Sequence, residues 1–192
     1  SESLNRDASV AVIAAILLLV VAYQGGYIFS EDDSSPNSVI DQTNETELSN
    51  SLDVIHPLAS TCISHGELTR HDHMYLTIQI EGQLVTIPEN VGVNSGACNE
   101  QGANMHVVHT HSSDGILHLE MQTDEDVELG VFFDVWGQHF DENGIFDYRV
   151  NSTHELVMYN RDVNGTLEDI DSFDNYILLN NQDIIISYRE RA

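Results

Sequence analysis

The chain has 192 residues, enough for one globular domain with a buried core beside a short apolar N-terminal run. Its 32 acidic residues face only six basic ones, all arginine, and the formal net charge is −26. This charge repels nucleic acids and anionic lipids and predicts that nucleic acid is not a partner, whereas divalent cations are attracted. Acidic side chains spread over a solvated surface are also typical of solubility in a saline setting.

The first predicted element is an apolar N-terminal helix. Residues 8–23 carry no charged side chain, and the run reaches the roughly 20 residues that a bilayer core requires only if residues 24–29 are included. The site for signal-peptide cleavage in "VVAYQGGY" is poor, so a retained anchor is favoured. Arg6 favours a cytoplasmic N-terminus. We therefore predict a single-pass anchor at 1–29 in the cell membrane, with an extracytoplasmic C-terminal domain.

An alternative for this helix stays open. A short polar start, an apolar helix and a β-rich head are also the layout of archaeal type IV pilin-like subunits, in which the helix packs against neighbouring copies in an extracellular filament. The processing signal expected for such subunits is not visible in "SESLNRDAS". The helix is thus predicted to contact either a membrane or neighbouring apolar helices of a homo-oligomer.

The segment 30–55 is predicted to be an acidic, polar linker. It is rich in Ser, Asn, Asp and Glu and holds few apolar residues, which is typical of an extended stalk. One Asn-x-Ser/Thr sequon lies here at Asn44, and two more follow at Asn151 and Asn164. These three asparagines are predicted glycosylation sites of an exported domain.

Two cysteines, Cys62 and Cys98, flank the first strand-like segment of the remaining domain, 56–192. A pair of cysteines in an exported domain more often forms a disulfide than stays free, so we predict a Cys62–Cys98 bond. A zinc site built from cysteine and histidine is the alternative. Neither cysteine belongs to a CxxC pair, and the motif support for zinc–cysteine ligation is accordingly weak.

Two strand pairs are predicted next. Apolar residues alternate with polar ones from His73 to Ile80, and a Gly turn at 81–83 leads into a returning strand that stops at Pro88. Residues 105–111 and 116–121 form the second pair, around the Asp-Gly turn signal within 112–115.

A helix and three late strands complete the prediction. Val127, Val131, Phe132 and Val135 follow helical spacing, and Gly137 ends this helix. Strands are predicted near 145–150, 155–160 and 183–188. The fold class is β-rich α+β, and the order of elements favours a β-grasp-like arrangement with an inserted hairpin, by analogy.

The segment "HTHSSDGILHLE" predicts a metal site on the second hairpin. With a four-residue loop at 112–115, His109 opposes His118; with a two-residue loop at 114–115, His109 opposes Glu120. Either register gathers three histidines and one carboxylate on one face: His109, His111, His118 and Glu120. A three-residue loop would instead separate His118 from the other two histidines.

The earlier pair, His71 and His73, shares one face of its strand by i, i+2 spacing, opposite the apolar stripe. Five imidazoles with a carboxylate, Glu120 or Asp72, suit zinc, copper, nickel or iron, and nearby methionines slightly favour copper. Surface histidines on polar strands are the alternative, and convergence of five favours the metal. His106 falls on the other side of its strand. The remaining histidines are predicted to be non-ligands: His56, His65, His139 and His154.

The ordered motifs "HDHMYLTI", "EGQLVTIPENVGV", "HTHSSDGILHLE" and "LGVFFDVWGQ" resemble an uncharacterised family of exported or membrane-anchored archaeal and bacterial proteins. The resemblance covers about residues 70–138 and implies that the five histidines match the family's histidines. Three departures are seen: Ser112 stands where Asp is commoner, Tyr75 stands where a third His often occurs, and Cys98 lies further ahead of "HTH" than usual. These departures imply fewer metal ligands.

The function favoured by the sequence is an anchored metal-binding domain for copper or zinc. It would act in metal capture or delivery, or as an accessory subunit of a membrane complex. A pilin-like structural subunit is the first alternative. A metal-dependent enzyme, with an open metal position and Glu120 as base, is the second, and it ranks below binding because no substrate motif is present.

Overall fold

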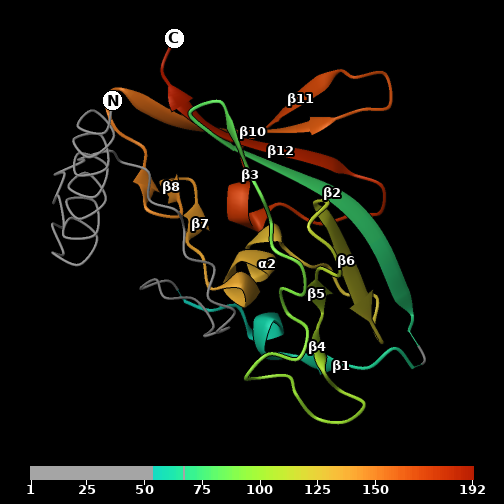
Figure 1. Cartoon of the computed structure of the whole chain (residues 1–192). Coiled ribbons are helices and arrows are strands. Elements are labelled where there is room, and N and C mark those ends of the chain that lie inside the picture. Colours follow the sequence, from blue (N-terminus) through green and yellow to red (C-terminus); the bar gives the residue numbers. More distant parts are fainter. Residues whose placement is uncertain (1–53, 67) are drawn as a thin grey trace, which may run out of the picture. The chain divides into compact units, whose positions relative to one another are not determined.

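A computed structural model of the chain describes residues 54–192 except residue 67, and these belong to one compact unit (Figure 1). The segment 1–29 predicted to form the N-terminal helix, most of the linker and Asn44 lie outside the described residues, so the anchor and the pilin-like alternative remain predictions. Within the described part, no helix combines the length and the apolar character that a membrane crossing needs.

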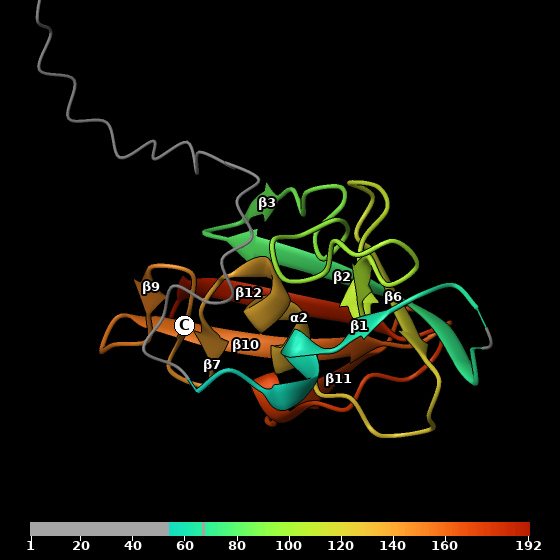
Figure 2. The same ribbon diagram turned by 90° about the horizontal axis from the view of Figure 1, so that it is seen from below.

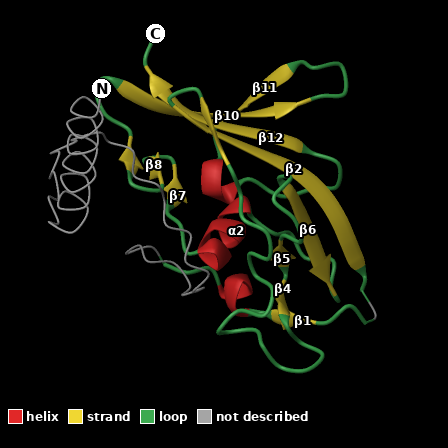
Figure 3. Ribbon diagram, in the orientation of Figure 1, coloured by secondary structure: helices red, strands yellow, loops and turns green. Residues whose placement is uncertain are grey.

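Strands make up most of the regular secondary structure of the described part, with a mixed seven-stranded sheet at its centre (Figure 3). The strand order is β11-β10-β12-β2-β6-β5, with β3 also paired to β2. Only the β12–β2 pair is parallel. The strands are β2 (Arg70–Ile80), β3 (Gln83–Val85), β5 (Val108–His109), β6 (Ile116–Met121), β10 (His154–Arg161), β11 (Leu167–Ile170) and β12 (Asp183–Glu190).

Strand β2 is the centre of this sheet. Its apolar side chains from Met74 to Ile80 are buried, whereas His71, His73 and Tyr75 are exposed, which confirms the predicted alternation. One edge of β2 pairs with β12, and the other pairs with β6 and then with β3. The tight turn into β3 is made by Glu81 and Gly82, both at positive φ, as a two-residue hairpin favours.

The apolar face of the sheet packs against helix α2 (Leu129–Trp136), which lies in front of the central strands in the view from below of Figure 2. Phe132 and Phe133 are fully buried in the shared core. Gly137 ends the helix in the left-handed conformation, where it carries no Cβ penalty, as predicted. Two short 3₁₀ helices, η1 (Pro57–Ser60) and η2 (Phe173–Asn175), lie beside α2. The architecture is therefore α+β and mostly β.

The predicted strand over 105–111 is wrong in its extent, because it divides into β4 (Met105–His106) and β5. Strand β4 pairs with β1 (Cys62–Ile63) in a separate two-stranded sheet, and only β5 pairs with β6. The division arises because the amide of His106 donates to Gly92 O while the carbonyl of Val107 accepts from Glu120 N, so the chain changes partners here.

The predicted strand over 145–150 is also divided. Phe146 has φ of 53°, which breaks the extended backbone between β8 (Gly144–Ile145) and β9 (Tyr148–Arg149). These two strands and β7 (Phe140–Asp141) form a three-stranded sheet. The strands predicted at 155–160 and 183–188 are confirmed as β10 and β12, and the returning strand at β3 ends at Val85, before Pro88.

The predicted disulfide between Cys62 and Cys98 is present, with the two Cα atoms 5.4 Å apart. It joins β1 to the loop that precedes β4. Beside it, the buried imidazole of His106 accepts from Ser95 Oγ at 2.7 Å through Nε2 and donates to Ala59 O at 2.7 Å through Nδ1. The disulfide and these hydrogen bonds fix η1 and the Cys98 loop to the strand that leads into β5.

Candidate metal centre

The β5–β6 hairpin adopts the register predicted for a loop at 112–115, with His109 directly opposite His118. Asp114 Oδ1 accepts from Ile116 N at 3.1 Å, and Gly115 has φ of 82°. A Cβ at Gly115 would lie 2.7 Å from Leu76 O, so glycine is required where the turn passes β2. The turn thereby sets which histidines face each other.

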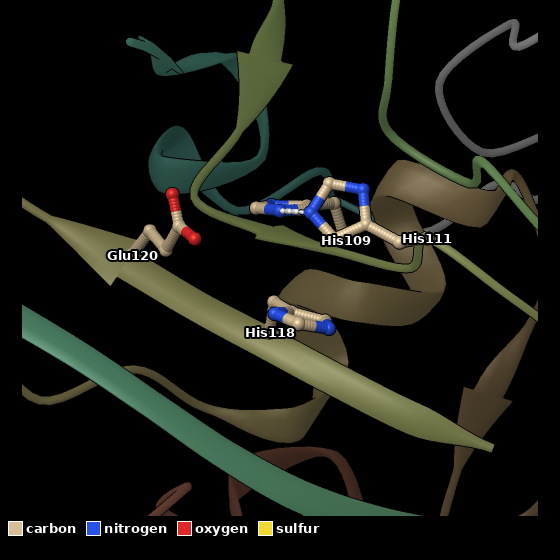
Figure 4. Close-up of side chains that lie close together, drawn as sticks. All are labelled: His109, His111, His118 and Glu120. Carbon is tan, nitrogen blue, oxygen red and sulfur yellow. Dashed lines mark hydrogen bonds between the residues drawn. The ribbon is translucent and has the colours of Figure 1, made fainter. Parts of the chain in front are cut away.

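Four side chains of this hairpin form what we call the inner group: His109, His111, His118 and Glu120 (Figure 4). One donor atom from each lies within 4.8 Å of every other. His109 and Glu120 are buried, at 0% and 1% exposed, whereas His111 is exposed. The group thus extends from the protein interior to its surface.

His109 is oriented toward its neighbours by the backbone carbonyl of His106. Its Nδ1 donates to the carbonyl of His106 at 2.9 Å, so the proton of the neutral ring is on Nδ1 and Nε2 keeps its lone pair. The Nε2 atom lies 3.2 Å from His111 Nε2. Zinc–nitrogen bonds of about 2.0–2.1 Å in a tetrahedral site hold nitrogen donors about 3.3–3.4 Å apart. Burial lowers the pKa of His109 to about 3, so its imidazole is neutral and able to ligate at neutral pH.

One ring nitrogen of His118, Nδ1, is buried without a hydrogen-bond partner among the described residues. Burial, followed by the charges of His111, His73 and His71, lowers the pKa of His118 to about 4. A neutral imidazole with an unsatisfied buried nitrogen fits a metal ligand, because a coordinated ion would satisfy that atom.

Glu120 brings a carboxylate into the same buried space. Its Oε1 lies 3.2 Å from His71 Nε2, and its Oε2 lies 3.0 Å from His65 Nδ1. Oε2 nevertheless forms no hydrogen bond of good geometry within the described residues. Burying a carboxylate is costly unless it is paired or coordinates a cation, so Glu120 also fits a ligand role.

A second cluster, which we call the outer group, consists of His71, His73 and His118 and meets the same donor-distance limit. It forms because β2 lies beside β6, with His73 opposite His118 and His71 opposite Glu120. The ring centroids of His73 and His118 are 4.5 Å apart, and those of His71 and His73 are 4.8 Å apart.

The six residues predicted as ligands therefore come together, but as two overlapping groups that share His118. His65, predicted to be a non-ligand, lies at the site: it contacts Glu120, and its ring centroid is 6.1 Å from that of His111. The sequence contained one indication that His65 lies near the site: it follows Cys62 by three residues, and the disulfide holds this segment near β4.

The other histidines lie in different surroundings. His106 is enclosed by Ser95 and Ala59, as described above. His56 Nδ1 caps η1 by accepting from Leu58 N, and His154 contacts Glu81 and stacks on Tyr188. His139 Nε2 lies 3.2 Å from Asp141 Oδ1.

A cavity of about 370 Å³ lies apart from both histidine groups. Its walls come from the segment before η1, from α2 and from the regions of β7 and η2, and they include His56, Asp134, Asp141 and Asp174. Burial and nearby carboxylates raise the pKa of Asp174. None of the inner-group or outer-group residues lines this cavity.

No protein-family model, curated protein or solved structure matches this chain. The family resemblance of the motifs therefore remains a prediction.

Proposed function

We propose that this chain is a membrane-anchored extracytoplasmic domain that binds a copper or zinc ion through the inner group. It would act in metal capture or delivery, or as an accessory subunit of a membrane complex. The observation that carries the proposal is the convergence of His109, His111, His118 and Glu120 with donor atoms within 4.8 Å of one another.

The donor set decides which metals suit the inner group. Three imidazoles and one carboxylate match the preferences of zinc and copper, whereas calcium and magnesium take mainly oxygen ligands. The lowered pKa values of His109 and His118 keep both imidazoles neutral at pH 7, so no proton has to leave them before the ion binds. The high negative charge of the chain adds a long-range attraction for divalent cations.

The test is metal binding by the full chain, measured by calorimetry at pH 7.5 with Zn²⁺ and with Cu²⁺. The parent is expected to bind at least one equivalent tightly, and a His109→Ala, His111→Ala double variant should lose at least 100-fold in affinity for that equivalent. His154→Asn, which removes a histidine outside both groups, is the matched control and should bind like the parent. Unchanged affinity in the double variant would refute the proposal, provided that circular dichroism shows an intact fold.

A metal-dependent enzyme is the second candidate, and the exposure of His111 is the observation that favours it. An ion held by buried His109 and exposed His111 would remain accessible to solvent, as a metal-bound nucleophilic water requires. The 370 Å³ cavity lies elsewhere, which favours binding over turnover of a large substrate. Hydrolysis of an activated ester by the zinc-loaded chain, abolished in the His109→Ala, His111→Ala variant, would favour the enzyme.

A further inference from the structure

The outer group differs from the inner group in exposure. His71 and His73 are exposed on the polar face of β2, and His118 is half-buried between the two groups. His73 and His118 lie opposite each other on the paired strands β2 and β6. Rigid strands rather than a loop therefore hold the outer group in place. An ion from solvent can therefore reach the outer group without passing through the inner one.

The chemistry of the outer group also points to a transition metal. Its members are three imidazoles, and donor atoms within 4.8 Å of one another need only small side-chain rotations to reach the spacing of metal ligands. A neutral imidazole has one free lone pair, so it binds one ion; when its remaining ring proton is released to solvent, the resulting imidazolate can bind a second ion through the other nitrogen, and His118 can then serve both groups. The Glu120 carboxylate lies 3.2 Å from His71 Nε2 and connects the two groups a second time.

We propose that the outer group, His71, His73 and His118, is a second metal position that takes a divalent transition-metal ion and shares His118 with the inner group. The inference rests on the proposed function, because it assumes that the inner group is the first position. The inner and outer groups together would then hold two ions, and all five histidines would be ligands.

The two positions should fill in order. The inner group offers a buried carboxylate, which attracts a cation strongly because little water screens it, so it fills first. The second ion would bind next to the first and share a ligand with it, and repulsion between the two ions should weaken its affinity. We expect the second equivalent to bind at least ten-fold more weakly than the first.

The experiment is a zinc titration of the full chain and three variants by calorimetry, with the stoichiometry confirmed by elemental analysis after gel filtration. The parent should bind two equivalents. His73→Asn, which removes only an outer ligand, should bind one equivalent with the affinity of the parent's tight step. His109→Asn should bind one equivalent weakly. His118→Asn should bind both equivalents at least ten-fold more weakly than the parent does.

Each outcome decides the question. If the parent binds one equivalent and His73→Asn matches it, the second position does not exist, while the proposed function stands. If His73→Asn still binds two equivalents, the outer group is not a metal position. If His118→Asn retains one equivalent at the parent's affinity, the shared ligand is refuted. If the parent binds no zinc or copper, the proposed function fails together with this inference. His154→Asn is again the control, and circular dichroism confirms that each variant is folded.

Discussion

The imidazole of His109 is the most constrained functional group at the residue scale. It is fully buried, donates through Nδ1 to a backbone carbonyl and presents Nε2 to His111. This pattern resembles the outer-sphere hydrogen bond that orients a metal-binding histidine and selects its tautomer. The same burial makes protonation of the folded state unfavourable.

Stability of the metal-free chain should therefore depend on pH through His109. The unfolded chain takes up a proton at this residue near pH 6.5, whereas the folded chain does so only near pH 3, so the stabilising contribution is complete above pH 6.5 and is lost as the pH falls toward 3. The full loss amounts to about 4–5 kcal/mol by linkage at about 1.4 kcal/mol per pKa unit. His118, with a pKa of about 4, acts in the same direction.

Urea unfolding of chelator-treated protein at pH 7.5, 6, 5 and 4 measures this dependence. The His109→Gln variant removes the titrating group and should show a flatter decline than the parent, although carboxylates contribute to both curves. Equal slopes for the two proteins between pH 6.5 and 4 would show that the folded imidazole is not kept neutral.

His65 is expected to position Glu120 rather than to bind the metal. Its Nδ1 lies 3.0 Å from the buried Oε2, and its side chain is 61% exposed. Loss of an outer-sphere partner typically lowers metal affinity by about 10–100-fold, so His65→Ala should weaken the tight zinc step by that factor without changing the stoichiometry. His65→Asn, whose amide nitrogen replaces Nδ1 and can still donate, should recover part of the loss. A change in stoichiometry would make His65 a ligand instead.

At the scale of elements, the β5–β6 hairpin positions the inner group through its turn. Gly115 adopts φ of 82°, and a Cβ added to it would lie 2.7 Å from the Leu76 carbonyl oxygen of β2. The amide of Leu76 also donates to Gly115 O at 2.8 Å. The turn is thus attached to the strand that carries the outer histidines.

Gly115→Ala should destabilise the fold and weaken zinc binding, because its Cβ would meet Leu76 O at 2.7 Å as well as straining the backbone. Gly165→Ala is a matched control: Gly165 has φ of 85°, and its Cβ would meet open space. Backbone strain alone costs about 1 kcal/mol, so the control should lose about that amount, whereas Gly115→Ala should lose about 2–3 kcal/mol. Similar unfolding free energies for both variants would contradict the close approach.

At the scale of the whole molecule, charge is unbalanced. The chain holds six arginines for 32 acidic residues, and the described arginines already contact carboxylates or backbone carbonyls, as Arg70 does with Asp72 and Arg161 does with Asp183. Most acidic side chains therefore repel one another across the surface, which opposes compaction.

Salt should consequently stabilise the metal-free fold. Screening shortens the Debye length from about 30 Å at 0.01 M to about 3 Å at 1 M, and the repulsion weakens accordingly. Raising NaCl from 0.01 to 1 M should increase the melting temperature by at least several degrees. Sucrose of matched osmolality controls for non-ionic effects. A melting temperature that falls with NaCl would mean that the ion pairs outweigh the repulsion.

Local patterns in the sequence determined a large part of this protein. Alternation from His73 to Ile80 predicted β2, the Asp-Gly signal predicted a hairpin turn within 112–115 without deciding its loop length, and Gly137 predicted the end of α2. The disulfide pairing was also predicted, since only two cysteines are present. Each of these features depends on a few neighbouring residues or on composition, so a single sequence is sufficient to predict it.

Only the tertiary structure decided how the histidines are divided. The sequence predicted five imidazoles on the polar faces of two strand pairs. It did not specify that β6 lies beside β2 in the register that pairs His73 with His118. It also did not bring His65 to Glu120, because that contact spans 55 positions in sequence and depends on β1 pairing with β4. Strand order and register arise from long-range packing of the apolar faces, which residue spacing along one strand does not encode.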